Sequence, residues 1–198
     1  MNDVTLKKVT GVVATFTPFG ILFAGLFSSC RNNLNWWHSL SASYYNIPTM
    51  AVFTSCFFIL AVLLILNKGI LTKIVGILLF LIVIFPCADK TIPITQKYIG
   101  VLHLDLELSN TIHSLSSFGA LVCMVIEIIY FLYAYENKKV YLISILCIAL
   151  ATALIVIENI YHNQGNWSLH WTTIITETTL FVSFGHSYYF NGSDVKKR

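Results

Sequence analysis

Apolar positions along the chain cluster into long, nearly uninterrupted runs that are separated by shorter polar stretches. Six of these runs have the length, roughly 20 residues, that a helix needs to cross the hydrocarbon core of a bilayer. We expect the spans near residues 10–29, 48–66, 69–86, 111–133, 140–157 and 169–190. The third run contains Lys73, whose long side chain can reach the near interface. The pattern predicts an all-α fold: a single domain, residues 1–198, forming a polytopic bundle of six transmembrane helices.

Basic residues divide unequally between the two sides of such a bundle. Nine lie at the termini and in or next to the second and fourth connections: Lys7, Lys8, Lys68, Lys73, Lys138, Lys139, Lys196, Lys197 and Arg198. The remaining connections hold three: Arg31, Lys90 and Lys97. Because cytoplasmic loops carry the excess of Lys and Arg, we expect both termini in the cytoplasm. The expected location is a cell membrane, of the bacterial cytoplasmic type, with the chain crossing it several times.

Composition agrees with lipid as the main solvent. Charged residues make up 11% of the chain and hydrophobic ones 57%, whereas a soluble domain carries about 25% charged residues. The net charge of +3 is too small and too dispersed to indicate a nucleic-acid partner. Membrane lipids are the expected partners, and homo-oligomerisation stays open. Cys30 and Cys87 fall at outward helix ends, where their thiols are either joined in a disulfide or left unbridged.

The first outward connection is rich in aromatic and hydroxyl side chains. Its candidate binding residues are Trp37, His38, Ser41, Tyr44 and Tyr45. Tryptophan and tyrosine favour the headgroup level of a membrane, where the ring is apolar and the N–H or O–H stays hydrated. The segment is either an interfacial anchor or the wall of a shallow site for a lipid headgroup or a sugar.

The second outward connection alternates leucines with polar residues over positions 102–108. Strict alternation is the period of a strand and places His103, Asp105 and Glu107 on one face. Because a lone strand cannot bury its backbone, we expect an interfacial segment with its leucines toward lipid or the bundle. With His113, the first two are candidate ligands for a divalent metal such as zinc; the alternative is a solvated face. Because no zinc signature such as His-Glu-x-x-His occurs, no cofactor is expected, with zinc kept as the alternative.

Ionisable residues inside the spans are the strongest functional candidates, because each costs roughly 2.5–3.5 kcal/mol or more at mid-bilayer. His113 and Glu127 belong to one helical stripe of the fourth span, and Glu177 lies in the sixth. We expect His113 and Glu177 to face each other below the first outward connection, as a candidate catalytic acid–base pair. Glu158, at the outer end of the fifth span, is a further binding candidate. Hydrogen bonding between helices and an ion or proton path are the alternatives.

Several short motifs resemble those of small bacterial membrane proteins grouped as domain of unknown function nine-nine-eight. They are Leu40–Tyr45 with its Ser-x-Tyr-Tyr pattern, Ile84–Pro86, Ile112–Ser116 and Glu177–Gly185. Order and spacing agree over nearly the whole chain. The resemblance implies a six-helix bundle and singles out Ser41, Tyr44, Tyr45, His113 and Glu177. It implies no activity.

A more distant similarity is to membrane hydrolases of the alkaline ceramidase and progestin-receptor type, which use Ser, Asp and several His around zinc. Here Ser116, Asp89 or Asp105, His103 and His113 would take those parts. The paired His-x-x-x-His of the last helix is absent, and His186 stands alone.

Three functions therefore remain. The first is a binding, sensing or accessory module whose polar outward site takes a lipid or a partner. The second is a membrane-embedded hydrolase, with or without a metal, for a lipid at the outer leaflet. The third is a proton- or ion-coupled transporter.

Overall fold

The computed structural model describes residues 2–32, 39–45, 47–87, 98–99, 102, 104–163 and 172–191. Within them the chain forms six α-helices: α1 (Asp3–Asn32), α2 (Ile47–Leu66), α3 (Ile70–Ile84), α4 (Leu106–Ala134), α5 (Lys138–Asn163) and α6 (Thr172–Asn191). Each overlaps one of the six apolar runs. Several helices extend past the apolar run because polar residues at their ends continue the helical hydrogen bonding.

The smaller elements lie in the α1–α2 and α3–α4 connections, which were predicted to face outward. They are a 3₁₀ helix, η1 (Ser41–Tyr45), and two short antiparallel strands, β1 (Tyr98–Ile99) and β2 (Leu104–Asp105), with Tyr98 opposite Asp105. The strand period noted over 102–108 does not continue beyond Asp105, because helix α4 begins at Leu106. Asp105 caps α4 by accepting hydrogen bonds from the N–H groups of Glu107 (2.9 Å) and Leu108 (3.4 Å), which starts the helix there. Asp105 and Glu107 therefore do not share one strand face.

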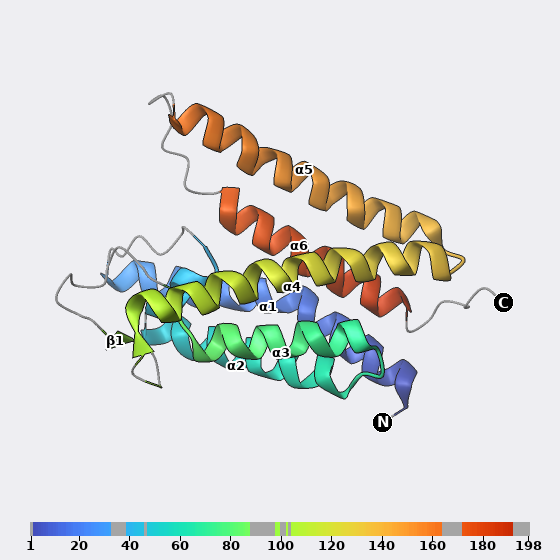
Figure 1. Cartoon of the computed structure of the whole chain (residues 1–198), viewed down its shortest axis with the longest axis horizontal. Coiled ribbons are helices and arrows are strands. Elements are labelled where there is room, and N and C mark those ends of the chain that lie inside the picture. Colours follow the sequence, from blue (N-terminus) through green and yellow to red (C-terminus); the bar gives the residue numbers. More distant parts are fainter. Residues whose placement is uncertain are drawn as a thin grey trace.

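The helices pack in a ring that follows the order of the chain. Each helix contacts its neighbours in sequence, and α1 closes the ring against α6, while α4 also contacts α6. Figure 1 shows α6 lying between α5 and the rest of the bundle. The closing contact depends on two glycines: a Cβ on Gly11 would lie 2.6 Å from the Gly185 carbonyl oxygen, and one on Gly185 would lie 2.6 Å from that of Gly11. Small residues let two backbones approach this closely.

The outer surface of the bundle is apolar. Large hydrophobic side chains are widely exposed, among them Phe16, Leu115 and Phe118 at 64–69%. Among the described residues, four helical segments are long and apolar enough to cross a membrane: Asp3–Phe27, Thr49–Leu66, Leu106–Ala134 and Lys138–Glu158. Ile70–Ile84 is apolar but shorter. The polar residues of α6 instead include many that are buried, such as Thr176, Ser183 and Ser187. The chain thus has the surface of a membrane protein.

The two ends of the bundle differ. At one, here the turn end, Figure 1 shows the start of α1, the end of α6 and the short connections α2–α3 and α4–α5. At the other, the loop end, lie η1 and the β1–β2 pair. Polar side chains join separate parts of the chain at both ends, as Glu177 does with Leu40 at the loop end and Lys7 with Asn191 at the turn end.

Candidate functional site

Residues 39–45, here the cap segment, fold into a compact turn at the loop end. The Ser43 N–H and Oγ both donate to the Leu40 carbonyl, at 3.2 and 2.6 Å, and the Ser43 carbonyl accepts a hydrogen bond from Thr49 Oγ1 at 2.7 Å. These bonds satisfy the backbone of a segment that would otherwise bury unpaired polar groups. Leu40, at the centre of these bonds, is 1% exposed.

Glu177 of α6 holds the cap segment from one side. Its Oε2 accepts a hydrogen bond from the Leu40 N–H at 2.6 Å. An N–H donor bonded to a carboxylate oxygen is a charge-assisted pair whenever the carboxyl group is ionised, and such bonds are short and strong. The contact spans 137 positions of the chain, so it fixes the cap segment to the last helix.

His113 of α4 holds the segment from the other side. Its Nδ1 lies 2.7 Å from the Phe85 carbonyl oxygen and its Nε2 lies 3.0 Å from Ser41 Oγ. A carbonyl only accepts, so Nδ1 carries the proton and, in the neutral ring, Nε2 accepts from the Ser41 hydroxyl. The Phe85 carbonyl is one of the last of α3, which has no helical partner. One turn earlier in α4, Ser109 bonds the Pro86 carbonyl at 2.9 Å.

The three groups Ser41, His113 and the Phe85 carbonyl form a hydroxyl–imidazole–acceptor series. In enzymes with a serine nucleophile, the hydroxyl donates to a histidine base that a third group orients. The same arrangement also explains a purely structural role, because His113 then ties the end of α3 to the cap segment. Geometry alone therefore admits both a binding and a hydrolytic site.

A cavity of about 160 Å³ lies directly under the cap segment. Leu40, Ser41, Ser117 and Glu177 contribute to its wall. The rest of the lining is mostly apolar and comes from α2, α3, α4 and α6, and includes Phe57, Leu79, Met124 and Phe181. Engineered apolar cavities of about 150 Å³ bind benzene-sized ligands. The cavity is thus suited to an apolar group that ends near a few polar atoms.

The structure brings three of the predicted site residues together: Ser41, His113 and Glu177. His113 and Glu177 differ from the expected pair, because they bond successive residues of the cap segment and not each other. The predicted proton-sharing pair is therefore replaced by two separate anchors. Each side chain finds a closer partner in the segment that covers it.

The other predicted binding residues either do not line the cavity under the cap segment or lie outside the described residues. Tyr44 is half-buried, packs against the apolar core, and burial raises the pKa of its hydroxyl. The side chain of Tyr45, and the whole of Trp37 and His38, lie outside the described residues. Glu158 is half-buried on α5 and does not line the cavity.

Of the predicted metal ligands, Asp105 and His113 lie within the described residues. Among the described residues no cluster of three His, Cys, Asp or Glu side chains is placed to hold a metal ion. Asp105 caps α4, and both ring nitrogens of His113 already have partners. His103 lies outside the described residues, as does the side chain of Cys30. The pairing of Cys30 with Cys87 therefore stays a prediction.

Two backbone groups of the site were missed from the sequence, namely the Leu40 N–H and the Phe85 carbonyl. Every residue carries such groups, so no residue type marks them. The Phe85-Pro86 step is the one available signal, because proline ends a helix and leaves the preceding carbonyls without partners.

No family model, no curated protein and no solved structure matches the chain.

Proposed function

We propose that the chain is a six-span protein of a cell membrane with both termini in the cytoplasm and the cap segment facing outside. The lysines of the turn end support this orientation, since Lys7, Lys68 and Lys138 lie at helix ends or connections there. The small bacterial family described above fits the same proposal, because Ser41, His113 and Glu177, which carry the resemblance, meet at one site.

Cysteine labelling tests the orientation. In a background without the natural cysteines, Leu102→Cys at the loop end is expected to react with a membrane-impermeant maleimide applied to intact cells. Lys138→Cys at the turn end is expected to react only after permeabilisation. Leu102 is 56% exposed and Lys138 is exposed as well, so neither is hindered by burial. The reverse pattern would overturn the orientation.

For the activity we propose a binding module that takes the apolar part of a lipid or lipid-like ligand under the cap segment. The observation that carries this is the mostly apolar cavity covered by Leu40 and Ser41 and lined by Glu177, with Ser41 held in place by His113. Ligand pockets have this character, with apolar walls and few polar groups that fix orientation. The anchored segment supplies a cover that opens only when these bonds break.

Photocrosslinking with a diazirine-bearing acyl lipid tests the binding proposal. Crosslinks are expected in the peptides around 117–124 and 177–181. Ala120 is 3% exposed and lines the cavity, so Ala120→Leu is expected to fill space and remove these crosslinks. Ala153→Leu, on an exposed position of α5, is the matched control and should leave them unchanged. Equal crosslinking in both variants would assign the signal to the lipid-facing surface.

The second candidate is a hydrolase acting on a lipid, and the Ser41–His113 hydrogen bond of 3.0 Å favours it. His113 would accept the Ser41 proton as the hydroxyl attacks a carbonyl, while the Phe85 carbonyl keeps the ring oriented. A fluorophosphonate probe tests this directly, because it labels activated serines. Labelling that is lost in Ser41→Ala but kept in Ser117→Ala, on the same cavity wall, would establish the hydrolase. Absence of labelling would leave the binding module.

A further inference from the structure

A second cavity, of about 240 Å³, lies at the turn end and plays no part in the function proposed above. Its walls come from α1, the α2–α3 connection, α3, α4 and α6. Its volume is several times the ~30 Å³ that a water molecule occupies in the liquid. It is more polar than the cavity at the loop end, because four charged side chains and two asparagines line it together with aromatic rings.

Glu127 of α4 places a carboxylate with an unused oxygen in this cavity. The side chain is 5% exposed, and its Oε1 accepts a hydrogen bond from the Thr72 hydroxyl of α3. Its Oε2 is buried and has no hydrogen-bond partner among the described residues. A buried carboxylate oxygen without a partner is costly, which calls for a donor from a ligand.

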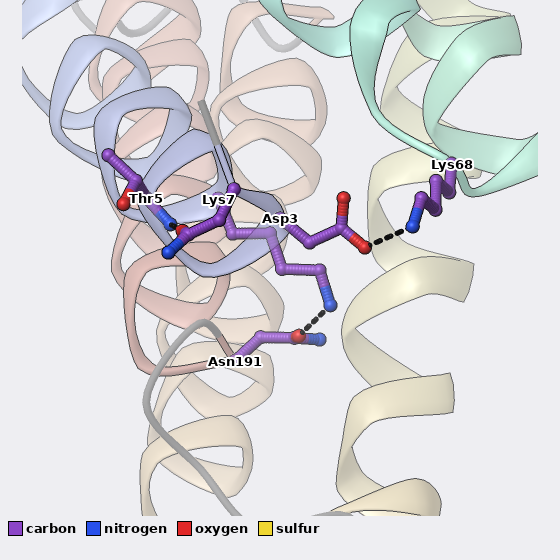
Figure 2. Close-up of polar contacts among 6 residues, drawn as sticks. Asp3, Thr5, Lys7, Lys68 and Asn191 are labelled. Carbon is purple, nitrogen blue, oxygen red and sulfur yellow. Dashed lines mark hydrogen bonds and ion pairs between the residues drawn. The ribbon is translucent and has the colours of Figure 1, made fainter.

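Asn191, the last residue of α6, has a buried donor that lacks an acceptor among the described residues, whereas Glu127 has an acceptor that lacks a donor there. It is 4% exposed, and its Oδ1 accepts a hydrogen bond of 2.7 Å from Lys7 Nζ, as Figure 2 shows. Its Nδ2 is buried without an acceptor in the part of the chain that the structure describes. An unused amide donor beside a lysine ammonium is a place for an anionic acceptor.

The mouth and the side walls fit a ligand that carries both charges. Asp3 and Lys68 form an ion pair of 2.5 Å at the mouth, visible in Figure 2, with side chains 53% and 82% exposed. Such an exposed pair contributes little stability and yields readily to a competing charged group. The rings of Tyr130, Phe131, Tyr135 and Tyr188 line the cavity, and aromatic faces favour a nearby cation.

We propose that this cavity binds an aminoethyl phosphate group, with its ammonium on Glu127 Oε2 and its phosphate on Asn191 Nδ2 beside Lys7. A simple cation would leave the Asn191 donor unused, and an anion alone would leave Glu127 Oε2 unused. A trimethylammonium group has no N–H to donate, so the site discriminates against choline phosphate. The group comes either from the headgroup of phosphatidylethanolamine or from free phosphoethanolamine.

Two measurements on the purified full chain separate these sources. The first is calorimetric titration in detergent with phosphoethanolamine and, as comparator, phosphocholine. The second is the thermal unfolding midpoint in nanodiscs of phosphatidylethanolamine or of phosphatidylcholine. Binding of free phosphoethanolamine at least about tenfold tighter than phosphocholine identifies the soluble ligand. A higher midpoint in phosphatidylethanolamine identifies the lipid. Absence of discrimination in both measurements overturns the proposal.

Variants then assign the binding to the two orphaned groups. Glu127→Gln and Asn191→Leu are each expected to weaken the binding of phosphoethanolamine by about tenfold or more, since each removes a charge-assisted bond. In nanodiscs, each is expected to abolish the difference in unfolding midpoint between the two lipids. Glu136→Gln removes an exposed carboxylate from the α4–α5 connection at the same end and is the matched control. If either variant fails to fold, the proposal is tested on the unaltered chain by comparing phosphoethanolamine with phosphocholine and phosphatidylethanolamine with phosphatidylcholine. Unchanged binding in a folded Glu127→Gln protein overturns the proposal.

Discussion

Replacing Glu177 by leucine should release the cap segment from α6. The Glu177 Oε2 is the acceptor for the Leu40 N–H, at 2.6 Å, and Leu40 is 1% exposed. Leucine keeps much of the side-chain volume but offers no acceptor. The Leu40 N–H then has to stay buried without a partner or move out, and moving out pulls the adjacent Ser41 from His113.

The expected size of the effect follows from the kind of bond. A hydrogen bond to a charged group contributes about 1.5–3 kcal/mol, and a neutral one about 0.5–1.5 kcal/mol. At about 1.4 kcal/mol per factor of ten, opening of the cap segment should become roughly 10- to 100-fold more frequent in Glu177→Leu. Glu177→Gln keeps a neutral oxygen acceptor, so its effect should be distinctly smaller.

Hydrogen exchange of the Leu40 amide measures this opening directly, because exchange reports local unfolding free energies. Mass spectrometry of the peptide that contains Leu40, at several labelling times, gives the protection of the amide in each variant. Thr173→Val, on an exposed position of the same helix, controls for general loosening of α6. The reasoning would be refuted if the Leu40 amide stayed as protected in Glu177→Leu as in the unaltered protein.

Two further predictions concern packing and buried polar bonds. Gly185→Ala should destabilise the protein by about 1–3 kcal/mol through overpacking, because its Cβ would lie 2.6 Å from backbone atoms of α1; Gly20→Ala, with its nearest neighbours at 3.9 Å and beyond, should be tolerated in the same thermal unfolding assay in detergent. Thr72→Val should cost about 1–3 kcal/mol, because it removes the one hydrogen bond that Glu127 has among the described residues. Thr54→Val, whose hydroxyl bonds only the backbone of its own helix, should change the unfolding midpoint little. Equal midpoints for Thr72→Val and Thr54→Val would contradict this.

The helices could be located from the sequence because lipid imposes a simple rule on it. A segment that crosses a bilayer must satisfy its backbone internally and stay apolar over about 20 residues, so length and hydropathy suffice. The same rule explains why His113, Glu127 and Glu177 were recognised as special before their contacts were known. Their cost in an apolar setting is a property of the residue and does not depend on the partner.

The partners themselves depended on tertiary structure. His113 and Glu177 were expected to meet, but the cap segment lies against both, and its Leu40 N–H and Ser41 hydroxyl are the nearer partners. The alternation at 102–108 placed Asp105 and Glu107 on one face, yet Asp105 caps α4 and the strand period ends at that residue. A local side-chain bond to two N–H groups outweighs a periodicity that a two-residue strand pair cannot support.

The apolar helices, their number in the described chain and the polar residues that need partners thus follow from the sequence by itself, because each depends on local composition. Which groups meet was decided only by the fold, because long-range hydrogen bonds join backbone and side-chain atoms far apart in the chain. The turn-end cavity is the clearest case: Glu127 and Asn191 come from different helices, and only the closed ring shows that both keep an unused polar atom in the same space.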